Sequence, residues 1–382
     1  MRISVISAAL VASLVGYGST IALVLAAARA VTATEAQTAS WVLAISLAKG
    51  LGSAGLSFFA RVPVVLAWST PGAALFAATV GRNMQQAVGA FVVAGLLTAL
   101  TGAVTPLDKA VALIPDGIAA GMLAGVLVPF CLAGAGAAQG LGWLALPMLL
   151  VFAVVRLRNS ALAVLAALAT AVGSADGFAG ALGPDLAFAL PTLSYIAPEC
   201  QLDVVVGLAR PLSLVTMASQ NFPGFATMRA AGYTPPVRPA RVTTGLISSL
   251  TAFFGAHSLS MAAITAAICR GDDVQPDRAA RWQVGLVYGG IWVALGLLSP
   301  LILPLLQSLP LDVIALIVAL ALLGPLLGAL TAACAKPDTR FAATLTLTVT
   351  ASGVAAFGVG AAFWGLLAGL GLCVLENVAR HW

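Results

Sequence analysis

The sequence predicts an all-α polytopic membrane protein of about fourteen transmembrane segments, and three observations lead to this class. Hydrophobic residues make up 61% of the chain and charged residues only 8%, whereas soluble domains carry about 25% charged residues. Apolar runs approaching the ~20 residues of a spanning helix recur throughout the 382 residues. Connections between them are short, typically about 2 to 8 residues. No room is left for a soluble domain.

Each expected span is an apolar run bounded by charged residues or by Gly and Pro. The first follows Arg2 and is too long for the apolar region of a typical signal peptide, so we expect it to be retained. The spans are expected at residues 4–27, 37–58, 63–80, 84–104, 111–132, 142–156, 160–177, 203–228, 240–255, 257–270, 283–306, 310–333, 341–357 and 359–378.

The longest loop divides the chain into two halves. We expect a first repeat at 1–178, an external loop at 179–202 and a second repeat at 203–382. Seven spans in each half is an odd number, so the halves would have opposite orientations and form an inverted repeat. A weak echo supports this: Pro115 and Pro310 each follow an Ala-Leu pair at the same distance, and an acidic residue follows each proline.

Basic residues predict the orientation of the chain, because cytoplasmic loops of membrane proteins are enriched in Lys and Arg. With the N-terminus inside, only Arg29 and Arg82 fall on outer loops. Both termini are therefore expected in the cytoplasm. The inner side receives Arg2, Arg61, Lys109, Arg156, Arg158, Arg229, Arg238, Arg241, Arg270, Arg278, Arg281, Lys336, Arg340 and Arg380.

The third and tenth spans are interrupted in a way that ordinary spanning helices are not. Residues 63–79 carry Ser69-Thr70-Pro71-Gly72 in their middle, and residues 253–269 carry Gly255, His257, Ser258 and Ser260. Such segments at corresponding places of two inverted halves indicate a transporter site. We expect an extended segment followed by a half-helix in each, with helix breaks near 67–71 and 255–258.

A half-helix that begins inside the membrane offers free N–H groups and a positive dipole end, which suit a carboxylate. Thr70, Pro71 and Gly72 are expected to open one half-helix, with Pro71 in the first turn, where no N–H is needed. Residues 258–260 are expected to open the other. The alternative is a kinked contact between helices, since Gly, Ser and Thr are common packing residues in membranes.

Four further polar residues are candidates. His257, one of two histidines, could bind substrate or carry a proton, since imidazole titrates near physiological pH; it could also be a neutral hydrogen-bonding group. Gln220 and Asn221 could contact a carboxylate or link helices. Lys49 could act directly, extend toward the membrane surface, or pair with a carboxylate such as Asp116 or Asp312.

Nothing in the sequence predicts an enzyme, a cofactor or a metal site. The five cysteines are scattered without a CxxC pair. The chain lacks the H-E-x-x-H, G-x-S-x-G and G-x-x-x-x-G-K-[ST] motifs, so hydrolysis and ATP-driven pumping are not expected. The energy source should be an ion gradient.

Three long stretches resemble the benzoate/proton symporter (BenE) family of bacterial inner-membrane proteins, and the resemblance covers essentially the whole chain. They are RVPVVLAWSTPGAAL (61–75), PLSLVTMASQNFPGFATMRAAGY (211–233) and FFGAHSLSMAAITAAICRG (253–271). That family is similar to the uracil, xanthine and ascorbate permeases, which implies seven-plus-seven inverted repeats, a core domain, a gate domain and an elevator-like motion. The substrate-binding positions it implies are Ala67, Trp68, Ser69, Thr70, Pro71, Gly72, Ser219, Gln220, Asn221, Ala256, His257 and Ser258.

One departure from the permeases matters for the substrate. Where they bind a neutral ring with acidic side chains, this chain has Ser, Gln, Asn and His. A buried glutamate would repel a carboxylate, so the departure favours an anionic substrate and puts nucleobase transport in doubt.

The sequence thus predicts proton-coupled import of benzoate or a similar small aromatic carboxylate across the bacterial inner membrane. His257 is the candidate for proton coupling. A passive small-anion channel or facilitator, and a nucleobase or sulfate carrier on the same fold, are the alternatives. Benzoate, protons and membrane lipid are the expected partners, a homodimer is one candidate assembly, and nucleic acid is not expected.

Overall fold

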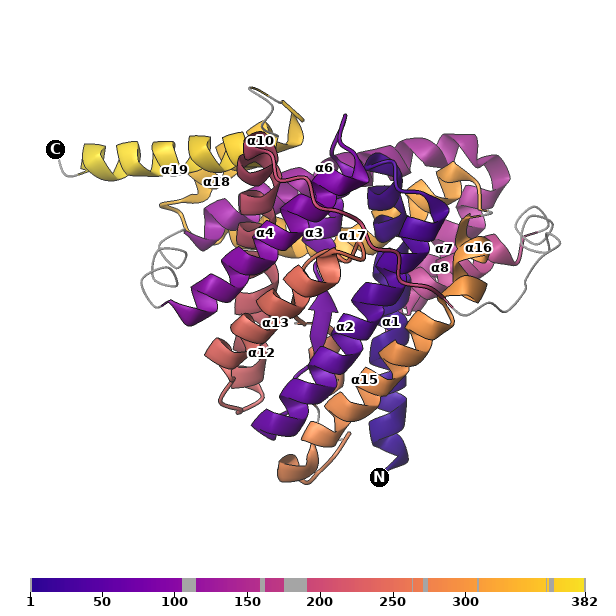
Figure 1. Ribbon diagram of the computed structural model, residues 1–382. Coiled ribbons are helices and arrows are strands. Elements are labelled where there is room, and N and C mark those ends of the chain that lie inside the picture. The colour runs from indigo at the N-terminus through magenta and orange to yellow at the C-terminus, as the bar shows by residue number, and fades with distance from the viewer. Residues whose placement is uncertain are drawn as a thin grey trace.

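The computed structural model is a helical molecule with two short strands near its centre (Figure 1). It describes residues 2–104, 115–158, 162–174, 191–262, 264–270, 274–307, 309–354, 356 and 361–380. The first half of the expected external loop, residues 179–190, lies outside the described residues.

The elements of the first half follow the apolar runs of the sequence. They are α1 (Ile3–Ala30), α2 (Glu35–Ala60), β1 (Leu66–Trp68), α3 (Thr70–Ala77), α4 (Met84–Ala103), α6 (Asp116–Gly140), the 3-10 turn η1 (Gly142–Leu144), α7 (Ala145–Arg158) and α8 (Ala163–Val172).

The second half begins with one winding helical span that contains two π-helical stretches. Its elements are α10 (Leu202–Val204), η2 (Val205–Ala209), α11 (Arg210–Thr216), η3 (Met217–Asn221), α12 (Phe222–Ala230), α13 (Val237–Ala252), β2 (Leu259–Met261), α14 (Ile264–Ile268), η4 (Arg278–Ala280), α15 (Trp282–Leu297), α16 (Ser299–Gln307), α17 (Leu311–Cys334), α18 (Arg340–Ala351) and α19 (Ala361–Arg380).

Several helices begin where the sequence supplies a capping side chain. Thr34 and Gln37 form a reciprocal capping box at the start of α2, and Asn83 and Gln86 do the same for α4. Such caps satisfy N–H groups that the first turn of a helix leaves unpaired. The local sequence therefore sets where these two spans begin.

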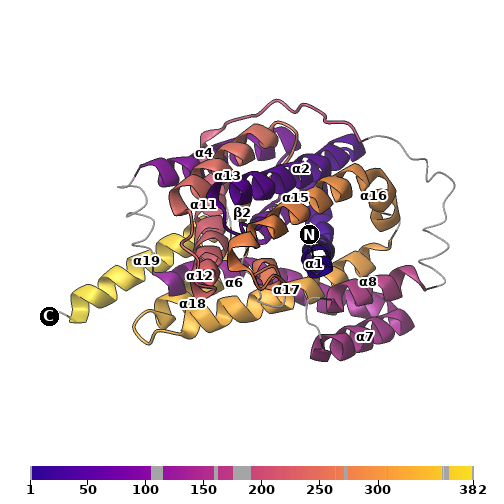
Figure 2. The same cartoon turned by 90° about the horizontal axis from the view of Figure 1, so that it is seen from below.

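The helices pack as two groups. In the first group, α2 packs against α15, α13 against α4, and α1 against α3 and α15. In the second group, α6 packs against α17 and α18, α18 against α19, and α7 against α8. Figure 2 shows the groups as two layers, with α1 between them.

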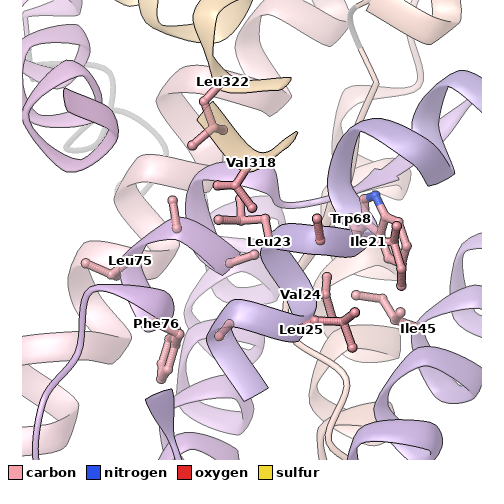
Figure 3. Close-up of a cluster of buried hydrophobic side chains, with 14 of the residues drawn as sticks. Ile21, Leu23, Val24, Leu25, Ile45, Trp68, Leu75, Phe76, Val318 and Leu322 are labelled. Atoms are coloured by element: carbon pink, nitrogen blue, oxygen red, sulfur yellow. The ribbon is translucent and has the colours of Figure 1, made fainter. Parts of the chain in front are cut away.

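The contact between the groups, which we call the seam, is apolar and runs along α1 and α3. α1 contacts α8 and α17, and α3 contacts α6. Figure 3 shows Ile21 of α1 beside Trp68, and it draws Leu25 of α1, Phe76 of α3 and Val318 of α17 in the same apolar cluster. These five side chains are almost fully buried. None of these five side chains carries a charge. The two helix groups therefore meet here through apolar side chains.

Some helix pairings are those that an inverted repeat requires. In the expected repeat, α2 of the first half corresponds to α13 of the second, and α4 corresponds to α15. The contact of α2 with α15 therefore has its counterpart in the contact of α13 with α4. In addition, α6 and α17 each follow a proline N-cap, Pro115 and Pro310, carry an acidic residue in the first turn, and pack against each other. The seven-plus-seven layout of the whole chain stays a prediction.

The helices differ in length from the expected spans. Four helices, α2, α4, α6 and α17, are long and apolar enough to cross a membrane by themselves, and shorter apolar helices occur within 3–14, 20–30, 163–172 and 361–376. The span expected at 283–306 is divided, since α15 ends at Leu297 and α16 begins at Ser299. The apolar pattern did not indicate this division.

Candidate functional site

The two strands pair in the middle of the first helix group and join two distant parts of the chain. β1 and β2 are antiparallel, with Leu66 opposite Met261, Ala67 opposite Ser260 and Trp68 opposite Leu259. The pairing continues beyond the strands, because the Ser69 N–H donates to the Ser258 carbonyl over 2.8 Å. We call this paired segment the crossing. It confirms the expected extended segments within spans three and ten.

Directly after β1, α3 begins as the sequence predicts. Ser69 is its N-cap and accepts a hydrogen bond from the Gly72 N–H at 3.1 Å, while Pro71 lies in the first turn. Ser69 Oγ also lies 2.7 Å from Thr216 Oγ1 of α11. A Cβ on Gly72 would come within 2.5 Å of Leu212, so glycine permits this close approach of α3 to α11.

The second break differs from the prediction in its details. Residues 258–260 were expected to open a half-helix, but Ser260 lies within β2, and α14 is described only from Ile264 to Ile268. The physical reason is the partner strand, because backbone groups of 258–262 bond to β1 and its flanking residues instead of forming a helical turn. The prediction of the helix start at 258–260 was therefore wrong.

Span eight contacts the crossing through its π-helical stretch η3. Asn221 is fully buried, and its Oδ1 accepts a hydrogen bond from the Met261 N–H at 2.8 Å. Its amide nitrogen lies 3.7 Å from the sulfur of Met217. Gln220 is only partly buried, and Ser219 lies in the same stretch. In this structure Asn221 holds β2 against span eight, and substrate contact by residues 219–221 stays a prediction.

His257 is fully buried just before β2 and is held by an aromatic residue of α2. Trp41 Nε1 donates to His257 Nδ1 over 2.9 Å, and the two rings meet edge-on at a centroid distance of 5.7 Å. A neutral imidazole has one donor and one acceptor nitrogen, so the hydrogen bond places the proton on Nε2. This Nε2 has no hydrogen-bond partner of normal geometry among the described residues, although the Ser69 backbone is close enough to interact with the ring.

Unpaired buried polar atoms gather at the crossing. Besides His257 Nε2, they include Ser258 Oγ and Trp68 Nε1, which have no hydrogen-bond partner within the described part of the chain. Native proteins leave few such atoms, and each one calls for an explanation, such as a bound ligand or water. These atoms come from residues that the sequence predicted as substrate-binding. Ala67 is half-buried and Ala256 fully buried beside them.

The charges buried in the described residues are all basic. Lys49, Arg241, Arg270 and Arg281 have side chains less than 9% exposed, whereas no described Asp or Glu is buried. A buried cation without an ionic partner is unfavourable, and Lys49 forms no ion pair among the described residues, so its surroundings suit a negatively charged ligand.

An apolar crevice between α1, α8 and α17 does not supply a second candidate site. It offers hydrophobic side chains but no polar group that could recognise a carboxylate. The crevice is lined by Ile21, Ala22, Leu25, Leu168, Leu309, Ile314 and Ile317.

Two contributions to the site had no signal in the sequence. Trp41 was one more aromatic residue in an apolar helix, and only the fold brings it to His257. The surroundings of Lys49 were also missed, because Asp116 instead lies 3.6 Å from Lys336, and Asp312 lies against Gly140. Lys49 lies among aromatic rings of β1 and α15.

A helical membrane fold, two half-helix segments that meet through short strands, and buried polar groups at that meeting point define a multi-pass membrane transporter. The family comparison gives the particular group. A family model described as "Benzoate membrane transport protein" (BenE) matches residues 1–375. The chain therefore belongs to the BenE family, which is a family of transporters and not of enzymes.

Two relatives match over nearly their whole length. Inner membrane protein YdcO of Escherichia coli is 38% identical over 375 residues, covering 97% of this chain and 96% of that protein. The benzoate membrane transport protein of Acinetobacter baylyi is 32% identical over 365 residues, covering 95% of this chain and 92% of that protein.

Solved structures share the fold at low sequence identity. The transmembrane domain of the cyanobacterial bicarbonate transporter BicA has a TM-score of 0.63 at 12% identity and covers 97% of this chain and 98% of that chain. SLC26A9 also has a TM-score of 0.63, at 13% identity, with 98% of this chain and 66% of that chain covered. These likenesses establish the fold alone.

Proposed function

We propose that the chain imports benzoate, or a similar small aromatic carboxylate, together with protons across the bacterial inner membrane. Membership of the BenE family supports the substrate class. The observation that carries the proposal is the charge of the interior, where the described buried ionisable side chains include cations and a histidine but no carboxylate. Such an interior favours an anion and disfavours a cation.

The substrate is proposed to bind between the crossing and span eight. The residues involved are those of 67–72, 219–221 and 256–258. Support comes from the unpaired buried atoms of Trp68, His257 and Ser258 and from the start of α3, where the dipole end favours negative charge. The aromatic ring of the substrate would pack against the apolar side chains of the seam.

Proton coupling follows from the energetics of moving an anion. A benzoic-type acid has a pKa near that of glutamic acid, ~4.3, so it is ionised at pH 7. An inside-negative potential opposes its import by ~2.3 kcal/mol per charge per 100 mV. One proton moving with each anion cancels that charge.

His257 is the residue proposed to couple proton and substrate. Its hydrogen bond from Trp41 must break when the ring takes up a second proton. An imidazolium has two N–H donors and no acceptor, so a proton on Nδ1 would break the bond from Trp41 Nε1. A carboxylate at Nε2 would stabilise the charged ring. Substrate and proton would therefore favour the same form of the site, and each would strengthen the binding of the other.

Alternating access is proposed to occur by an elevator-type motion of the first helix group against the second. The apolar seam supports this, because it offers a surface along which one group can slide. With seven spans in each repeat, 1–178 and 203–382, both termini would lie in the cytoplasm, as the basic residues predict.

Uptake of radiolabelled benzoate into proteoliposomes tests the proposal. An imposed inward pH gradient is expected to drive accumulation above equilibrium, and a protonophore is expected to abolish it. Uptake that only equilibrates would instead indicate a passive channel or facilitator.

The structural likeness to the bicarbonate transporter BicA and to SLC26A9 favours a second candidate function, which is transport of small inorganic anions. Competition by sulfate and bicarbonate, with uracil included to represent the nucleobase alternative, would separate these substrates. Benzoate uptake that uracil or sulfate suppresses at equal concentration would contradict selectivity for aromatic acids.

A further inference from the structure

Lys49 on α2 is the most deeply buried of the described Lys and Arg side chains, at 1% exposed. Its Nζ lies 3.3 Å from the centroid of the Trp292 ring and 5.5 Å and 5.4 Å from those of Trp68 and Tyr288. Aromatic faces attract a cation, but they do not neutralise its charge. Within the described part of the chain, no carboxylate forms an ion pair with Lys49.

Two donors without partners share this aromatic cluster. Tyr17 OH and Trp68 Nε1 are buried and have no hydrogen-bond partner among the described residues. The ring of Tyr17 lies 5.9 Å from Trp68 and 5.8 Å from Trp292, and Trp68 lies 5.1 Å from Trp292, edge-on. A cation and two unpaired donors in one cluster provide positive charge and hydrogen atoms, but the described residues of the cluster include no negatively charged acceptor. A carboxylate supplies that acceptor.

The cluster is continuous with the start of α3. Trp68 directly precedes Ser69, the N-cap of α3. One helical turn beyond Tyr17 on α1, Thr20 Oγ1 lies 3.5 Å from Thr70 Oγ1 in the first turn of α3. Gly16, one residue before Tyr17, lies beside the lysine, since a Cβ there would lie 3.4 Å from Lys49 Nζ and 3.3 Å from the Trp292 ring. An anion at the α3 end could therefore meet the ammonium by a change of rotamer in the flexible lysine stem.

We propose that Lys49 is the counter-ion of the substrate carboxylate, with Tyr17 OH and Trp68 Nε1 as additional donors and the surrounding rings as contacts for the aromatic ring. This proposal rests on the proposed function, because it assigns the charge partner within the same site. It explains how a carboxylate can be bound inside the membrane without a fixed arginine beside it. Lys49 and the carboxylate would form an ion pair with no net charge, which avoids the cost of burying either charge alone.

The test compares benzoate with benzamide, a neutral molecule of nearly the same shape. Binding of both is measured by calorimetry to wild-type protein, Lys49→Met and Tyr17→Phe. Lys49→Met keeps an unbranched side chain but removes the charge, so we expect benzoate to bind roughly 30-fold or more weakly. Benzamide affinity should change much less. Tyr17→Phe should weaken benzoate roughly 5- to 10-fold by removal of one donor.

Tyr233→Phe is the matched control for Tyr17→Phe. The Tyr233 hydroxyl donates to the Arg278 carbonyl at 3.5 Å, and its ring contacts the Arg278 guanidinium, so its loss should leave the preference for benzoate over benzamide unchanged. Equal losses for the two ligands in Lys49→Met would show a structural role and overturn the proposal. If Lys49→Met does not fold, an unchanged preference in Tyr17→Phe overturns it.

Failure of the proposed function gives a different result. If the wild type binds sulfate or bicarbonate but not benzoate, the proposed substrate is wrong. The binding of that anion by Lys49→Met is then compared with its binding by the wild type. Undiminished binding in the variant then overturns the role of Lys49. A wild type that binds none of these anions overturns both.

Discussion

Replacing Asn221 tests how the crossing is held together. Its side-chain oxygen accepts the Met261 N–H at 2.8 Å, and both groups are buried. In Asn221→Ala this N–H loses its partner, which costs about 1–3 kcal/mol. Because Met261 pairs with Leu66 of β1, the geometry of the proposed site should loosen as well. We expect benzoate binding to weaken by about 1–3 kcal/mol, or roughly 5- to 150-fold.

Thermal unfolding and calorimetric binding of the purified variants check this prediction. Asn221→Asp keeps an acceptor for Met261 but buries a carboxyl group, so wherever that group is ionised it should lower both the stability and the benzoate affinity of the protein. Gln220→Ala is the companion variant, because Gln220 is only partly buried and should affect binding more than stability. Wild-type stability and affinity in Asn221→Ala would refute the reasoning.

Three further predictions concern the proton and the packing. His257→Gln keeps a hydrogen-bonding side chain but cannot titrate, so it should exchange benzoate while losing accumulation driven by a pH gradient; wild-type accumulation would exclude His257 as the coupling residue. Trp41→Phe removes the donor to His257 Nδ1, so protonation no longer breaks a bond, and the pH dependence of uptake should move to higher pH; an unchanged pH profile would count against coupling through this pair. Gly245→Ala would place a Cβ 2.3 Å from the Ala99 nitrogen of α4 and should destabilise the protein by about 1–3 kcal/mol in thermal unfolding. Gly55→Ala is its control, because a Cβ there would have nothing within 4 Å, and it should leave stability unchanged or raise it.

The sequence predicted the first break well because the signal there is local. Ser69 supplies the cap, Pro71 suits a first turn, and Gly72 permits close packing. Each of these preferences belongs to the residue itself. The start of α3 could therefore be predicted to within a residue.

The second break shows why the rest was harder. Ser258 and Ser260 resemble residues that open a helix, yet they pair with a strand far away in the sequence, and the gain from that pairing outweighs local preference. Asn221 was predicted as a ligand, whereas its bond to Met261 depends on how span eight winds past β2. Lys49 was recognised as a buried cation, but its aromatic neighbours come from β1 and α15, which lie far from it in the sequence.

The crossing is joined mainly through backbone atoms, and this has a consequence for how such proteins diversify. Backbone bonds such as those from Ser69 N to Ser258 O and from Ala262 N to Val65 O survive almost any change of side chain. Side chains around them can therefore be exchanged over evolutionary time while the frame that presents them persists. Solved structures only 12–13% identical to this chain share its fold, as expected where a frame is held by backbone bonds that depend little on the side chains.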